Sequence, residues 1–188
     1  MILSDVEIRE ALRSGDIRIE PFDPDSLGPC SVDLRLDTLF KVFRGDGEVD
    51  PTRLETVDSG ARLVDTGGEP FTLQPGQFVL ARTVERIALS KGLAAFLEGR
   101  SSVARMGVIV HAAGLVNPGT GMTKPVPVVL EIFNENVVPV KLYPGMRIVQ
   151  IIFLRLGRPA SAGYDERPSS KFVSQEEPSL LSSRGDRS

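Results

Sequence analysis

Two short segments carry most of the chemically reactive side chains of this chain. Glu98–Arg105 holds two arginines and two serines, and Leu130–Asn134 places Glu131 within an apolar run. Guanidinium groups offer planar, paired donors that suit phosphate oxygens, and a carboxylate on an apolar strand is expected to lie partly out of water. Together the two segments predict nucleotide chemistry that needs no protein-bound metal.

The sequence lacks the common metal and phosphate motifs. Its one histidine, His111, and its one cysteine, Cys30, are too few for the His/Cys zinc site of nucleobase deaminases. It also has no glycine-rich Walker or dinucleotide-binding loop. We therefore expect no zinc and no protein ligands to a metal. His111, which ends an apolar run, is expected to be structural, and Cys30 to be a small buried residue.

The composition further limits the class of protein to which this chain can belong. The chain has 188 residues, 41% of them apolar, which is enough for one packed domain. A net charge of −3 gives no basic face for a nucleic acid polymer. The charged start Met1–Asp5 resembles no signal peptide, and no apolar run is long enough to span a membrane. These features predict a soluble, cytoplasmic protein.

The N-terminal residues have the spacing of a capped helix. Ser4 and Glu7 fit a capping box, Leu3 and Ile8 are placed for a hydrophobic staple, and Gly15 is placed to end the helix. This pattern predicts a short helix over roughly residues 5–14.

Short β-branched runs broken by Gly and Pro follow, which is typical of an all-β barrel or sandwich. Within Cys30–Leu36 the alternation puts the apolar residues 32, 34 and 36 on one face and the polar residues Ser31, Asp33 and Arg35 on the other. The predicted strands are Ile17–Glu20, Ser31–Leu36, Leu39–Phe43, Phe71–Leu73, Phe78–Ile87, Gly107–His111, Val126–Phe133, Val137–Leu142 and Arg147–Leu156.

Two Pro-Gly segments resemble each other, Leu73–Leu80 and Leu142–Val149. In each, Pro occupies the second turn position and Gly the third, where a type II turn needs a positive φ, and an apolar strand follows. We expect them to form paired hairpin corners.

From about Gly157 the chain loses apolar residues, so we divide it into a β domain, 1–157, and a C-terminal tail, 158–188. Such a segment is expected to be mobile unless it docks on a ligand or a neighbour. Tyr164, Lys171, Phe172 and Gln175 within it are suited to close over a bound nucleotide. Its acidic pair, 176–177, is expected to be solvated.

Several motifs of the chain occur together as a set: Met1–Asp5, Gly28–Asp33, Gly99–Arg105, His111–Gly119, Val129–Glu131, Gln150, Tyr164, Lys171 and Gln175. As a set they resemble the dCTP deaminase branch of the trimeric dUTPase superfamily, from residue 1 to about 181. The resemblance implies an all-β, dUTPase-like distorted barrel or jelly roll with a short N-terminal helix. It also implies a homotrimer with active sites between subunits.

The resemblance implies the role of each site residue. Glu131 is the expected general acid/base, kept ionised by Arg105, while Ser101 and the backbone carbonyl near Ala113 hold the attacking water. Mg²⁺ is expected to be bound by the triphosphate of the substrate and not by protein side chains. The expected substrate-binding residues are Arg100, Ser101, Ser102, Val103, Ala104, Arg105, Ala113, Asn117, Val129, Leu130, Glu131, Gln150, Tyr164, Lys171 and Gln175.

The expected reaction is hydrolytic deamination of dCTP to dUTP and ammonia, with dTTP as a possible inhibitor. Water adds at C4 of cytosine, N3 gains a proton, and the exocyclic amine leaves as ammonia. One carboxylate can shuttle each proton in turn, and such a positioned group typically contributes roughly 10²–10⁴-fold.

Two departures from the family pattern bear on this expectation. Asn117 replaces an aspartate that in dUTPases helps to activate the water attacking phosphorus, and the loop Thr120–Pro127 is longer than usual. An amide cannot serve as that base, although it can still hydrogen-bond a sugar hydroxyl. This favours a reaction that stops at dUTP.

Other interpretations stay open at this point. One is a bifunctional enzyme that forms dUMP and diphosphate, and another is a regulatory protein that binds deoxynucleotides without turnover. For single residues, Glu131 can be read as an ordinary solvent-facing strand residue. Arg100 and Arg105 can likewise be read as surface ion-pair residues.

Overall fold

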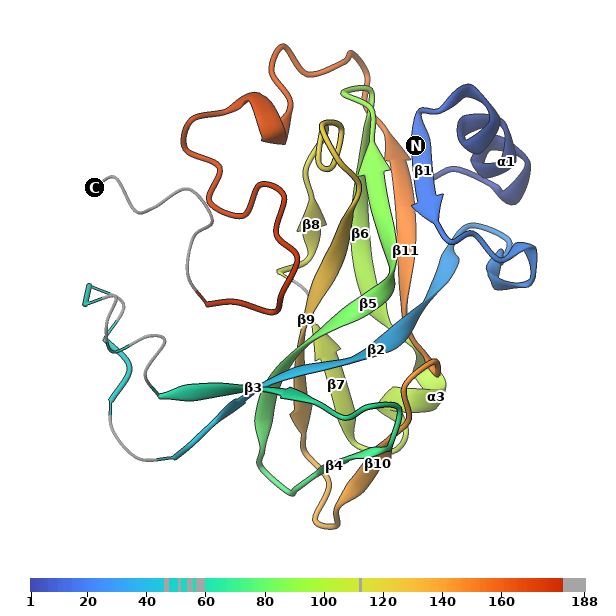
Figure 1. Ribbon diagram of the computed structural model, residues 1–188. Helices are drawn as coiled ribbons and strands as arrows, with labels where there is room; N and C mark the ends of the chain where they lie inside the picture. The colour runs from blue at the N-terminus through green and yellow to red at the C-terminus, as the bar shows by residue number, and fades with distance from the viewer. Residues whose placement is uncertain (46–47, 51, 54–55, 57–59, 112, 181–188) are drawn as a thin grey trace.

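The computed structural model describes residues 1–45, 48–50, 52–53, 56, 60–111 and 113–180. The chain is mostly β, with a short helix at its N-terminus (Figure 1). In chain order the elements are α1 (Asp5–Ser14), β1 (Ile17–Glu20), a 3-10 turn (Pro24–Ser26), β2 (Val32–Phe43), β3 (Ala61–Asp65), β4 (Phe71–Leu73), β5 (Phe78–Leu89), β6 (Leu93–Gly99), α3 (Ser101–Ala104), β7 (Val108–His111), β8 (Leu115–Val116), β9 (Val126–Asn134), β10 (Val140–Leu142), β11 (Arg147–Arg155) and a second 3-10 turn (Tyr164–Glu166).

The main sheet has the order β7-β9-β5-β2-β11-β6-β8, and β1 and β3 pair with β5 and β2. Every pair in it is antiparallel. β6, near one end of this order, also contacts β7 at the other end, so the sheet curls into a half-barrel. The predicted all-β fold with a short N-terminal helix is confirmed.

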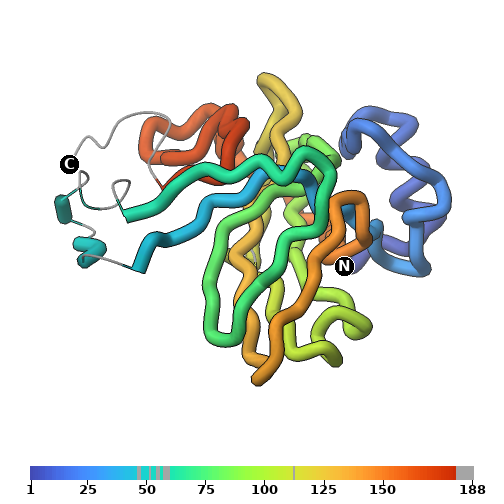
Figure 2. Tube along the Cα trace, turned by 60° about the horizontal axis from the view of Figure 1, so that its bottom comes forward, coloured from blue at the N-terminus to red at the C-terminus, as the bar shows by residue number. Residues whose placement is uncertain are grey.

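α1 and the tail lie on opposite sides of the molecule, and the ends of β2 and β3 project from its body as an arm (Figures 1 and 2). The hydrophobic core lies inside the curled sheet and contains residues from α1 and from nearly every strand. After β11 the described part of the tail contains no strand.

The predicted capping of α1 is present. The Ser4 backbone N–H donates to the Glu7 carboxylate at 2.9 Å, and the Glu7 backbone N–H donates to Ser4 Oγ at 3.4 Å. Gly15 ends the helix with a φ of 81°. Leu3 and Ile8 are completely buried, so the start of the helix is fixed to the core by both ends of the predicted staple.

The alternation predicted within Cys30–Leu36 is present in the first part of β2, where Val32, Leu34 and Leu36 are fully buried. The strands predicted over 31–36 and 39–43 are one strand, in which the pairing with β5 shifts between Leu36 and Phe40. The strand predicted from Val137 begins only at Val140, because Asn136 accepts backbone hydrogen bonds from both 137 and 138 and forms a turn.

Three strands were not predicted, namely β3, β6 and β8. β6 consists largely of Leu and Ala, which have modest strand propensity, and it is a strand because it pairs along its whole length with β11. β8 has only two residues and β3 is largely exposed, so neither gives a strong alternating pattern.

The two Pro-Gly corners are paired, as predicted. Gly76 and Gly145 have φ values of 69° and 83°, the left-handed conformation that the turn requires. The strands that precede them, β4 and β10, pair with each other, with Leu73 opposite Val140.

The prediction that Cys30 is buried was wrong. Cys30 is exposed at the tip of a tight loop that Gly28 closes by donating its backbone N–H to the Ser31 carbonyl at 2.8 Å. The alternation that buries apolar side chains begins only at Val32, after this loop.

The loop between β8 and β9 packs its backbone directly against neighbouring backbone. A Cβ added to Gly121, which has a φ of +71°, would lie 2.3 Å from the Ile87 carbonyl oxygen. A Cβ added to Gly119 would lie 2.4 Å from the Gly163 Cα atom at the start of the tail. Side chains at 119 and 121 would therefore push the loop off β5 and off the tail.

We predict that Gly121→Ala is much more damaging than Gly76→Ala. Both sites have nearly the same positive φ, +71° and +69°, but a Cβ at Gly76 meets nothing within 4 Å. Both substitutions carry the left-handed backbone penalty of roughly 1–2 kcal/mol, and only Gly121→Ala also forces a backbone shift. The free energy of unfolding by urea, compared at equal protein concentration, should fall at least about 2 kcal/mol further for Gly121→Ala. Equal losses would contradict the contact with Ile87.

Candidate active site

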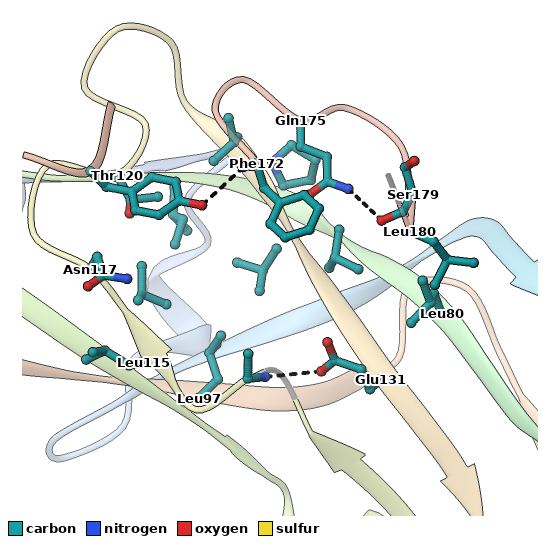
Figure 3. Close-up of a pocket in the computed structure, with 18 of the residues that line it drawn as sticks. Leu80, Leu97, Leu115, Asn117, Thr120, Glu131, Phe172, Gln175, Ser179 and Leu180 are labelled. Carbon is teal, nitrogen blue, oxygen red and sulfur yellow. Dashed lines mark hydrogen bonds between the residues drawn. The ribbon is translucent and has the colours of Figure 1, made fainter. Parts of the chain in front are cut away.

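A cavity of about 670 Å³ opens between β5, β9, β8 and the tail (Figure 3). This volume is in the usual range of small-molecule sites. The residues that line it are mainly apolar: Phe78, Leu80, Ile87, Leu97, Ala113, Leu115, Val116, Asn117, Thr120, Val126, Pro127, Val128, Val129, Glu131, Tyr164, Phe172, Gln175, Ser179 and Leu180. Glu131 is the one charged side chain in this set of described residues.

The alternation of β9 brings Glu131 to the cavity. Leu130 and Ile132 are fully buried in the core, so Val129 and Glu131 project from the other face of the strand. Glu131 lies directly opposite Leu80 on β5 and His111 on β7. The alternative in which Glu131 faces open solvent does not fit this placement, because its side chain lines the cavity and is only partly exposed.

A backbone group holds the Glu131 carboxylate. The Ala113 N–H donates to Glu131 Oε2 at 3.2 Å, and the φ of Ala113 is 22°, outside the common regions for an L-residue (Figure 3). The Ala113 carbonyl already accepts the Leu115 N–H at 2.8 Å. One lone pair of that carbonyl remains for the water that we expected it to hold.

Within one chain, the Arg-Ser-Ser segment lies away from this cavity. Arg100 is the N-cap of α3, and its Nε lies 3.1 Å from Asp33 Oδ1, on the polar face of β2. Gln150 on β11 lies directly opposite Asp33 and accepts a hydrogen bond from Ser31 Oγ at 3.1 Å. None of the residues of 100–105, nor Gln150, lines the cavity. Figure 1 shows α3 at the opposite end of the molecule from the tail.

The predicted site residues therefore form two groups. Those that line the cavity are Ala113, Asn117, Val129, Glu131, Tyr164 and Gln175. Those that do not are Arg100, Ser101, Ser102, Val103, Ala104, Arg105, Leu130, Gln150 and Lys171. Val103 and Leu130 have buried side chains, so they can meet a ligand only through backbone groups. Ser101, Ser102 and Arg105 are exposed.

The start of the tail is docked on the β8–β9 loop. The Tyr164 N–H donates to the Pro118 carbonyl at 2.7 Å. Asp165 accepts the backbone N–H groups of Gly121 and Thr123 at 3.2 and 3.0 Å. The β8–β9 loop is thus the surface on which the tail begins.

The later part of the tail covers the cavity. The Tyr164 hydroxyl accepts the Phe172 N–H at 3.2 Å, and Gln175 Nε2 donates to the Ser179 carbonyl at 3.1 Å (Figure 3). Ser179 and Leu180 line the cavity together with the predicted Tyr164, Phe172 and Gln175. Residues 181–188 of the predicted tail lie outside the described residues.

Several lining residues were not predicted. Thr120, Ser179 and Leu180 gave no distinctive pattern, and Leu97 and Leu115 belong to β6 and β8, which were not predicted as strands.

The expectation that the acidic pair of the tail is solvated was wrong for Glu176. Its carboxylate is paired with the Arg86 guanidinium and with Lys124 Nζ, the latter at 2.6 Å. These groups, Arg86 first, lower the pKa of Glu176 to about 2. Any stability the pairing contributes is present above the ordinary pKa of about 4.5 and is lost as the pH falls toward 2. Glu177 is exposed.

Within the described residues, no group of three or more His, Cys, Asp or Glu side chains is placed to hold a metal ion. No helix in this part of the chain is long and apolar enough to cross a membrane.

The chain is similar in sequence to known proteins. A dCTP deaminase-like family model matches residues 2–156. Proteins named "dCTP deaminase, dUMP-forming" from Streptomyces coelicolor and Acidothermus cellulolyticus are 42% and 47% identical over 182 and 169 residues. These alignments cover 95% and 87% of this chain and 93% and 85% of the relatives.

A solved structure has a similar fold. The 2′-deoxycytidine 5′-triphosphate deaminase of Agrobacterium tumefaciens superposes with a TM-score of 0.63 at 25% identity. The match covers 83% of this chain and 48% of that one, so this chain spans about half of its length. The expected dUTPase-like fold is confirmed, and the chain belongs to the dCTP deaminase-like family.

Proposed function

We propose that this chain hydrolyses the exocyclic amine of dCTP and releases ammonia. The observation that carries the proposal is Glu131, the one carboxylate among the described residues that line an apolar cavity of nucleotide size, held by the Ala113 N–H. Water adds at C4 of the cytosine while Glu131 takes one of its protons and passes it to N3. The hydroxyl now on C4 then gives up the other proton of that water through Glu131 to the amine, so that C4 becomes a carbonyl and the amine leaves as ammonia. A carboxylate in a largely apolar pocket suits this shuttle.

The triphosphate requires groups that the cavity of one chain does not supply. Arg100, Ser101, Ser102 and Arg105 lie outside it, with the serines and Arg105 exposed. We propose that a neighbouring copy in a homotrimer brings this segment to the cavity, where the guanidinium groups bind phosphate oxygens. Mg²⁺ would arrive bound to the triphosphate, which agrees with its preference for phosphate and water ligands.

We further propose that the reaction continues to dUMP and diphosphate. The relatives from S. coelicolor, Thermobifida fusca and A. cellulolyticus, at 40–47% identity, are all named dUMP-forming. Their names favour this bifunctional reaction over the expectation, based on Asn117, that the product is dUTP. In the second step a water attacks the α-phosphorus and diphosphate leaves. Because Asn117 cannot act as the base, the carboxylate available in the cavity for this step is Glu131.

Glu131→Gln should abolish deamination while dCTP still binds. The amide keeps the shape of the side chain but cannot take up a proton, so kcat should fall by about 10²–10⁴-fold. Ammonia release and the loss of cytosine absorbance measure turnover, and calorimetry measures binding. Glu135→Gln, an exposed residue just beyond β9, is the matched control. A fully active Glu131→Gln protein would show that another group is the acid/base.

The products should be dUMP, diphosphate and ammonia in equal amounts. Ion-exchange chromatography after incubation with dCTP and Mg²⁺ separates dUMP from dUTP. dUTP as the sole product would overturn the second step and leave the first intact, whereas binding without any product would indicate a regulatory protein. Asn117→Asp should increase the rate of diphosphate release, because it adds a carboxylate base to the lining of the cavity.

Shared sites predict complementation between two inactive variants. Arg105→Ala removes a phosphate-binding group and Glu131→Gln removes the acid/base, so each homotrimer should be inactive. When the two are unfolded together and refolded as an equal mixture, about one quarter of the sites should combine an intact Arg105 with an intact Glu131. Recovery of activity to that extent supports sites between subunits, and a mixture as inactive as its parents contradicts them.

A further inference from the structure

A set of charged contacts joins the tail to β5 and to the β8–β9 loop. The Glu176 carboxylate accepts hydrogen bonds from both terminal nitrogens of Arg86, one of them at 3.1 Å, and from Lys124 Nζ at 2.6 Å. Arg82 Nη1 donates to the Glu176 backbone carbonyl. We call Arg86, Lys124 and Glu176 the tail clasp.

The tail clasp lies at the edge of the cavity. Arg86 on β5 is directly opposite Pro127 on β9, and Pro127 lines the cavity. Gln175, the residue before Glu176, also lines it. Because consecutive residues share one short piece of backbone, fixing the Glu176 carboxylate also fixes where Gln175 meets the cavity.

The contacts are specific to Glu176. Its neighbour Glu177 is exposed and forms no ion pair with any described residue. The nearby Arg82 is already paired through its Nε with Asp37, at 2.5 Å. Arg86 and Lys124 are thus the cations that meet the tail carboxylate, and the two-point contact with Arg86 gives it a fixed direction.

The clasp is partly exposed, and this sets its strength. The side chains of Arg86, Glu176 and Lys124 are 33%, 37% and 60% exposed, so water and salt screen the attraction between them. A contact of this kind can be broken and remade at ordinary ionic strength. It therefore suits a segment that must open for substrate and close over it.

We propose that Glu176 is a positioning residue for the reaction, and that the tail clasp holds the tail closed so that Gln175 and Phe172 cover the bound nucleotide. This rests on the proposed deamination of dCTP. Glu176 itself does not line the cavity, so it acts through the backbone that it anchors. Lys124 comes from the β8–β9 loop, on which the start of the tail is also docked.

The two cations of the clasp and the nearby Arg82 also allow an opposite role for Glu176. Arg82, Arg86 and Lys124 could receive the phosphates of the nucleotide, with Glu176 occupying their place and competing with substrate. The two roles predict opposite effects of neutralising Glu176 on the affinity for dCTP. If Glu176 holds the tail closed, its neutralisation weakens dCTP binding, whereas if it competes with phosphate, its neutralisation strengthens binding.

The test compares Glu176→Gln with Glu177→Gln in the full chain. The two substitutions remove the same charge from adjacent residues, and both proteins should keep the melting temperature of the unsubstituted chain. We expect Glu176→Gln to raise KM for dCTP about tenfold with a change in kcat below about twofold. Glu177→Gln should leave both constants unchanged. Equal KM values for the two variants, or a lower KM for Glu176→Gln, would overturn the clasp.

A second readout needs no turnover. Trypsin should cut the nucleotide-free Glu176→Gln chain after Lys171 several times faster than the Glu177→Gln chain, because the tail is open more often. Raising the salt from about 50 mM to about 500 mM should speed this cleavage in the Glu177→Gln chain and have little effect on Glu176→Gln. If the unsubstituted chain fails to deaminate dCTP, the proposed function fails, and these cleavage rates still decide whether the clasp exists.

Lys124→Gln completes a double-mutant cycle. Its effect on KM should be smaller in the Glu176→Gln background than alone, because the partner carboxylate charge is already gone. Effects that multiply independently would show that Lys124 and Glu176 do not act together.

Discussion

In β9, side chains alternate between two environments, and the rest of the structure depends on that alternation. Leu130 and Ile132 enter the core completely, and this commits Val129 and Glu131 to the cavity. A slip of one residue would exchange the two sets and bury the carboxylate among apolar side chains. The register is fixed from both sides, because β5 and β7 both pair with β9 through Glu131. The hydrophobic core therefore sets the position of the carboxylate.

Local features of the fold could be predicted from the sequence, and features that depend on distant partners could not. The helix cap at Ser4 and the Pro-Gly corners follow from the spacing of a few neighbouring residues. β6 is different, since its Leu and Ala residues favour no strand by themselves and become one through pairing with β11. The exposure of Cys30 depends on how a four-residue loop closes before β2.

The site divides in the same way. Residue types and the family resemblance pointed to Glu131, Ala113 and Asn117, and these line one cavity. The same resemblance grouped them with Arg100 and Arg105, which lie outside the cavity of one chain. It implied sites between subunits, but the motifs themselves do not show which residues one copy supplies and which a neighbour supplies. Asp33 pairs with Arg100 on the polar face of β2, so that face orients a guanidinium group while its opposite face builds the core.

The tail is attached at two points of different character, and this affects how it can move. Near Gly163 the attachment is mainly backbone packed on backbone. The Asp165 carboxylate also accepts backbone N–H groups of the β8–β9 loop, and Glu166 pairs with Lys91. Near Glu176 the attachment is ionic. The segment between them is a short tether, so the released carboxylate stays at a high effective concentration near its cations. Reclosure is then a local search that needs no refolding of the remainder of the chain.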